Sequence, residues 1–99
     1  MERTLTNLRR KTEGDIYIFL RNEAIGKRFL QDAEDEGFTL GEDKPTLHPY
    51  AWVMALHDGT VNYVGTNGRI RFQCGDTRDF HRVDYEKYIA GAEDYSYTS

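Results

Sequence analysis

The chain has 99 residues, of which 38% are hydrophobic and 30% charged, and it contains one cysteine. This length suits a single core, so we expect one domain over residues 1–99, with residues 1–14 and 92–99 as flexible termini. One cysteine excludes an internal disulfide, and no apolar run is long enough for a signal peptide or a membrane span. These features predict a cytoplasmic protein that does not bind membranes.

Charge is distributed unevenly along the chain. The formal net charge is −4, and residues 32–58 hold seven acidic residues against one basic residue. A weakly acidic chain argues against direct nucleic-acid binding, which needs clustered Lys and Arg to displace phosphate counterions. The small basic cluster of Arg9, Arg10 and Lys11 is expected to belong to a solvated terminus.

The amino-terminal half predicts a strand followed by a helix. Residues 15–20 (DIYIFL) are apolar on both alternating faces, which is typical of a central strand. An N-cap at Asn22 and a glycine at Gly37 frame a helix from about Glu23 to Glu36, with Phe38 folding back on Ala33. Glycine and prolines then predict a loop over residues 39–50, at an edge of the fold.

Residues 51–73 predict a meander of three antiparallel strands. The dipeptides Asp58-Gly59 and Asn67-Gly68, typical of hairpin turns, separate runs rich in Val, Ile, Tyr, Trp and Phe. In the first strand we expect one face to carry Trp52, Met54 and Leu56. In the last strand we expect Ile70, Phe72 and Cys74 on one face and Arg69, Arg71 and Gln73 on the other.

The carboxyl-terminal part predicts an irregular segment and then a short helix from Tyr85 to Ala90, capped by Asp84 and closed by Gly91. The whole chain is therefore expected to be α+β, with the order β-α-β-β-β. One main helix would pack on a roughly four-stranded, mostly antiparallel sheet, although a parallel first strand with a right-handed crossover also fits. Apolar area beyond what one helix covers would favour a homodimer.

Residue types capable of catalysis or metal binding are present but scattered. Cys74, Asp79 and His81 include a nucleophile, an orienting group and a base, but sequence proximity does not supply the geometry. The histidines lack zinc-site spacing, since His48, His57 and His81 are far apart. Residues 65–68 (GTNG) are too short for a phosphate-binding loop and are expected to join two strands. We therefore expect no enzymatic activity, no metal and no cofactor.

The acidic middle of the chain gives the first functional hypothesis. The carboxyl end of the predicted helix is charged against its own dipole, and the following loop adds further carboxylates. We call this set the acidic zone: Asp32, Glu34, Asp35, Glu36, Glu42 and Asp43. Solvent screening of an exposed face would explain it, and so would docking on a basic surface of a larger partner protein.

A nucleotide-like ligand gives the alternative hypothesis. Aromatic and cationic side chains could stack a nucleobase and pair with phosphate, and the candidates are Trp52, Tyr63, Arg69 and Arg71. Ordinary burial preferences explain the same residues as core and as a solvated strand face.

In its size, acidity and short elements such as EGF at residues 36–38 and DYEKY at residues 84–88, the chain resembles a group of small phage proteins. These are the acidic α+β accessory proteins of bacteriophages and mobile elements, some of which inhibit host defence systems. The resemblance implies a non-enzymatic role, either occupying a partner's surface or sequestering a small ligand. It identifies no functional residue.

Overall fold

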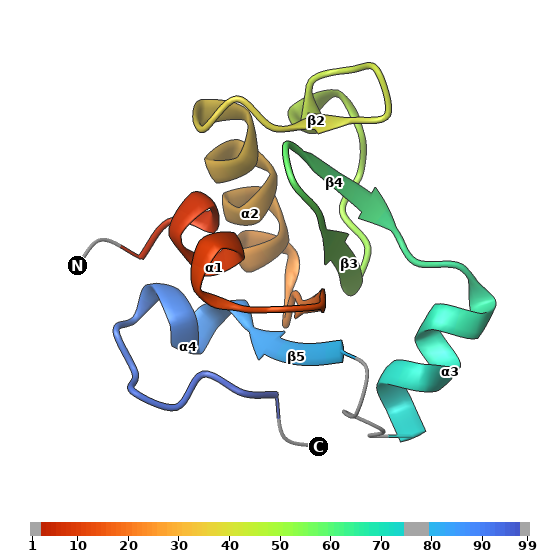
Figure 1. Cartoon of the computed structure of the whole chain (residues 1–99). Helices are drawn as coiled ribbons and strands as arrows, with labels where there is room; N and C mark the ends of the chain where they lie inside the picture. Colours follow the sequence, from red (N-terminus) through yellow and green to blue (C-terminus); the bar gives the residue numbers. More distant parts are fainter. Residues whose placement is uncertain (1–2, 75–79, 98–99) are drawn as a thin grey trace.

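The computed structural model describes residues 3–74 and 80–97 (Figure 1). In chain order the described elements are α1 (Leu5–Lys11), β1 (Asp15–Phe19), α2 (Glu23–Asp35), β2 (Thr39–Leu40), the 3₁₀ helix η1 (Pro45–Leu47), β3 (Val53–Leu56), β4 (Thr60–Tyr63), α3 (Thr66–Cys74), β5 (Phe80–Asp84) and α4 (Tyr85–Ile89). No helix in these ranges is both long enough and apolar enough to cross a membrane.

The strands form one five-stranded mixed sheet in the order β2-β4-β3-β1-β5. β3 is antiparallel to both β1 and β4, whereas β1 and β5 are parallel, as are β2 and β4. The α+β class and the interior position of β1 are confirmed. The prediction of four mostly antiparallel strands is wrong, since the sheet has a fifth strand and as many parallel as antiparallel pairs.

Two layers cover the two faces of the sheet. In Figure 1, α1, α2 and α4 gather on one side, and α3 stands apart from them. Ile16 and Ile18 of β1 join the main core beneath the three clustered helices. Tyr17 and Phe19, which alternate with them, pack against a smaller cluster that contains Phe72 of α3. The apolar character of both faces of β1 therefore has a direct structural cause.

The helix α2 begins and ends as its capping residues predict. The Asn22 side chain accepts a hydrogen bond from the Ile25 backbone N–H at 3.0 Å. At the other end Gly37 adopts a φ of 86°, and the Phe38 N–H donates to the Ala33 carbonyl at 2.8 Å. This is the Schellman ending expected from a glycine at that position.

The predicted last strand of the meander is wrong, because residues 66–74 form α3. A two-residue hairpin turn with Asn-Gly requires positive φ angles, and neither Asn67 nor Gly68 adopts one. The earlier turn is confirmed, since Gly59 has a φ of 78° and the β3–β4 hairpin closes around it. Asn67 and Gly68 instead lie in the first turn of α3. Glycine suits position 68 because a Cβ there would lie only 2.9 Å from Val64 Cβ.

Two predictions about side-chain faces are wrong, one in this segment and one at the start of the meander. In α3 Phe72 is fully buried, while Ile70 is 52% exposed, so they do not share an apolar strand face. Trp52 precedes β3 and packs edge-to-face against Phe72, with ring centroids 5.7 Å apart. It therefore belongs to the smaller cluster, and does not share a face with Met54 and Leu56 of the main core.

Both ends of the chain contribute structure within the described residues. The stretch expected to fray at the amino terminus contains α1, whose Leu5 and Leu8 are fully buried in the main core. Near the carboxyl terminus Tyr97 N–H donates to the Arg82 carbonyl at 3.0 Å, so the last described residues lie along β5. Residues 1, 2, 98 and 99 lie outside the described ranges.

The segment before α4 is partly a strand. Residues 76–82 are predicted to be irregular and residues 83–84 to open the helix, but residues 80–84 form β5, which continues directly into α4. The Asp84 side chain accepts from the Lys87 N–H at 3.4 Å, and Gly91 has a φ of 87°, so the predicted cap and end of this helix are confirmed.

Candidate functional site

The acidic zone lies at the carboxyl end of α2 and in the loop that follows β2. The structure divides it into two groups by exposure. The side chains of Asp32, Glu34 and Glu36 are half-buried, and those of Asp35, Glu42 and Asp43 are exposed. Two of the half-buried carboxylates, those of Asp32 and Glu36, bond to other helices of the fold.

Glu36 caps another helix. Its carboxylate accepts hydrogen bonds from the backbone N–H groups of Leu5 at 2.9 Å and Thr6 at 2.8 Å, and from the Thr6 hydroxyl at 2.7 Å. These N–H groups open α1 and have no partner within that helix. A carboxylate unfavourable at the carboxyl end of α2 is thus favourable at the amino terminus of α1.

Asp32 holds α2 to α4. It accepts a hydrogen bond of 2.5 Å from the Tyr85 hydroxyl. It also shares the single N–H of Arg28 Nε between its two oxygens, which lie 3.1 and 2.9 Å from that nitrogen. Burial, together with the hydrogen bond to Asp32, raises the pKa of Tyr85 well above its ordinary value. Asp32 and Glu36 are therefore structural, and their tertiary partners account for much of the charge placed against the α2 dipole.

Next to the acidic zone lies a cavity of about 480 Å³ between α2 and η1, which we call the α2–η1 cavity. Three of its lining residues contact carboxylates of the zone. Gln31 donates to Asp35 at 2.8 Å, Thr46 donates to Glu34 at 2.5 Å, and His48 Nε2 lies 3.1 Å from Asp43. The cavity lining is mostly apolar surface, contributed by Glu23, Lys27, Leu30, Gln31, Thr46, His48, Pro49 and Tyr50.

Most carboxylates of the acidic zone have no Lys or Arg partner among the described residues. Within the described ranges, ion pairs to Lys or Arg involve Asp32 in this zone but not Glu34, Asp35, Glu36, Glu42 or Asp43. Hydrogen bonds from neutral donors orient Glu34 and Asp35 without neutralising them. The zone therefore presents oriented carboxylates to solvent.

The four residues proposed to bind a nucleotide-like ligand, all within the described ranges, contact different parts of the protein and do not form one pocket lining. Trp52 packs in the smaller aromatic cluster, and the Tyr63 hydroxyl donates to the Pro49 carbonyl. The Arg71 guanidinium lies 4.8 Å from the ring centroid of Phe80. Because α3 is a helix, Arg69 and Arg71 do not project together as they would on a strand.

The structure describes only some of the residues that were weighed for catalysis or metal binding. His81 is exposed on β5, whereas Asp79 and the side chain of Cys74 lie outside what the structure describes. Within residues 3–73 and 80–97, no three metal-ligating side chains lie close enough together to hold a metal ion. The GTNG segment joins β4 to α3, so the expectation that it joins two strands is wrong.

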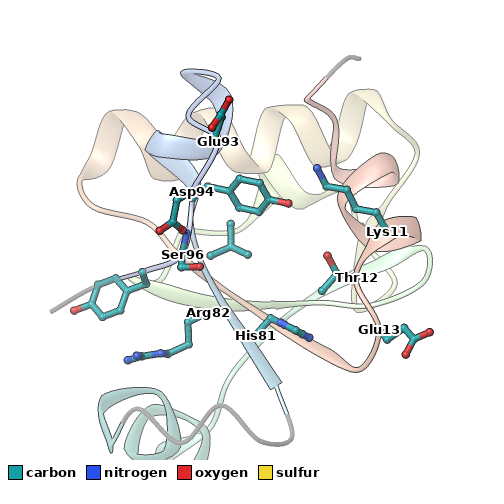
Figure 2. Close-up of a pocket in the computed structure, with 11 residues that line it drawn as sticks. Lys11, Thr12, Glu13, His81, Arg82, Glu93, Asp94 and Ser96 are labelled. Atoms are coloured by element: carbon teal, nitrogen blue, oxygen red, sulfur yellow. The ribbon is translucent and has the colours of Figure 1, made fainter.

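A second open cavity, of about 800 Å³, lies beside β5 (Figure 2). Lys11 and Glu13 approach it from the end of α1, and Asp94 and Ser96 from the tail. A hydrogen bond from the Ser96 backbone lowers the pKa of the Asp94 carboxyl. Both basic and acidic side chains line this cavity, so its composition favours neither sign of charge. It was missed from sequence because both segments were expected to be flexible.

Comparison with known proteins adds no functional assignment. A scan of protein-family models, a search of curated proteins and a search of solved structures each found no match. The geometry of the acidic zone is therefore the basis of the functional proposal.

Proposed function

We propose that this chain is a non-enzymatic protein-binding module that docks its acidic zone on a basic surface of a larger partner. The observation that supports this most is the exposed carboxylate group of Asp35, Glu42 and Asp43, which has no Lys or Arg partner among the described residues. Complementary charge of this kind mainly accelerates association and excludes wrong partners.

Rigidity supports the same role. The inner carboxylates fix α1, α2 and α4 to one another through Glu36 and Asp32. Asp35 therefore projects from a fixed helix. Backbone hydrogen bonds between Leu40 and Asp43 close the loop that carries the other two exposed carboxylates of the zone. A surface that needs little ordering when it binds has a lower entropic cost of association. An inhibitor that occupies a surface of a host-defence protein, as the resemblance to phage accessory proteins implies, would use such a face.

The test compares two triple variants with identical charge changes. The zone variant carries Asp35→Lys, Glu42→Lys and Asp43→Lys, and the control variant carries Glu13→Lys, Asp15→Lys and Glu93→Lys. All six positions are exposed. Asp32 and Glu36 are left unchanged because their loss would alter the fold itself. Both variants should melt close to the wild type.

Affinity capture from a bacterial lysate, followed by titration with each purified partner, supplies the measurement. We expect the zone variant to lose the partner and the control variant to retain it, with wild-type association slowing as salt is added. A partner that binds the wild type and both variants with one affinity would refute the proposed function.

A further inference from the structure

The α2–η1 cavity adjoins the acidic zone through three of its own lining residues. Gln31, Thr46 and His48 each line the cavity, and each contacts one carboxylate of the zone. Asp35, Glu34 and Asp43 therefore lie just beyond the lining of this mostly apolar cavity. The lining itself includes one cation, Lys27, which is paired with Glu23 at 2.9 Å.

The loop that forms one wall of the cavity is fixed in place by close packing and by a hydrogen bond. Tyr50 lies so close to α2 that a Cβ added at Gly26 would sit 2.3 Å from the Tyr50 ring carbon Cγ. The loop is also tied to β4, because the Tyr63 hydroxyl donates to the Pro49 carbonyl. The neighbouring η1 also exposes an apolar side chain to solvent, since Leu47 is 71% exposed. An interface with an apolar centre and a charged border has this form.

We propose that the α2–η1 cavity takes one apolar side chain that is flanked by Lys or Arg on the partner protein. The inference rests on the proposed function and adds the anchor that gives specificity. The carboxylates steer the basic flanks towards the cavity, and burial of the apolar side chain then slows dissociation. A purely basic segment satisfies the border and leaves the cavity unfilled.

Three short peptides separate these contributions. The first is acetyl-Lys-Arg-Leu-Arg-Lys-amide, the second replaces its leucine with serine, and the third is acetyl-Ser-Gly-Leu-Gly-Ser-amide. Each is titrated into isotopically labelled full-length protein, and backbone amide shifts are followed by NMR. We expect the first peptide to shift the amides of Leu30, Thr46 and Tyr50, and the serine peptide to bind about tenfold more weakly, since a buried leucine is lost.

The outcomes distinguish the two proposals. Equal binding of the leucine and serine basic peptides would overturn the anchor and leave charge-based docking intact. Equal binding of the basic and uncharged leucine peptides would overturn the role of the acidic zone. If none of the peptides shifts the cavity amides at millimolar concentration, the anchor proposal is wrong.

A pair of variants tests the same cavity from the protein side. Gln31→Phe places an aromatic ring at the cavity border, and Ala24→Phe places the same ring on α2 away from it; both positions are exposed. We expect Gln31→Phe to weaken the basic leucine peptide at least about fivefold while Ala24→Phe leaves it unchanged. An equal affinity for both variants would contradict the proposal.

Discussion

Removal of the Glu36 carboxylate should destabilise the protein far more than removal of its neighbour Asp35. Glu36 satisfies two backbone N–H groups and one hydroxyl at the start of α1. Hydrogen bonds to charged groups contribute about 1.5–3 kcal/mol each, and water can replace part of a half-buried set. We therefore expect Glu36→Ala to lower the free energy of unfolding by about 2–4 kcal/mol.

Glu36→Gln keeps one acceptor oxygen and should cost about half as much, because the amide nitrogen then faces a backbone donor. Asp35→Ala is the matched control, since Asp35 is exposed and accepts from Gln31 on its own helix; it should change stability by less than about 0.5 kcal/mol. Urea unfolding gives the midpoint and slope for each variant. A Glu36→Ala midpoint no lower than that of Asp35→Ala would refute the assignment of Glu36 as the cap of α1.

Two further predictions concern Tyr88 and Gly26. Burial raises the pKa of Tyr88 to about 12, above the ordinary value of about 10 for an unfolded chain. The unfolded state therefore loses the Tyr88 proton first, so the contribution of Tyr88 to stability is constant below about pH 10 and falls towards pH 12 by up to about 1.4 kcal/mol per unit. Tyr88→Phe should flatten this loss in pH-dependent melting, and an unchanged slope would contradict the prediction. Gly26→Ala should lower the free energy of unfolding, measured by urea titration, by about 1–3 kcal/mol, because the added methyl group forces Tyr50 to shift. A higher free energy of unfolding than the wild type would contradict this prediction, since it would show that Tyr50 moves at little cost.

The parts of the fold that sequence predicted are those with local causes. The ends of α2 depend on Asn22 and Gly37, whose partners lie within five residues along the chain. The strand β1 is recognisable because both of its faces are apolar. Likewise, the cap of α4 at Asp84 needs only the N–H of Lys87, three residues away.

The segment around Asn67 and Gly68 shows why other parts could not be predicted. Asn-Gly fits both a hairpin turn and the first turn of a helix, and the local pattern does not decide between them. The deciding contact is Phe72, which packs against Phe19 and Tyr97 from distant parts of the chain. Only the assembled sheet makes that burial favourable, so the tertiary contacts override the local signal.

The acidic zone was found from composition, but its division into two groups was not. Glu36 accepts hydrogen bonds from Leu5 and Thr6, which lie 31 and 30 positions earlier in the chain. Asp32 accepts a hydrogen bond from Tyr85, which lies 53 positions later. No local pattern indicates such partners. The α2–η1 cavity was missed for the same reason, since its walls come from a helix and from a loop that looked irregular.

The most direct test of the account is the association rate of the captured partner with the wild type and with the Asp35→Lys, Glu42→Lys, Asp43→Lys variant, measured across ionic strength. Between about 0.01 and 0.15 M the Debye length falls from about 30 to about 8 Å. We predict that the wild-type rate falls steeply over this range, and that the variant associates at least about tenfold more slowly at the low end. Equal rates for the two proteins at every ionic strength would contradict docking through the acidic zone.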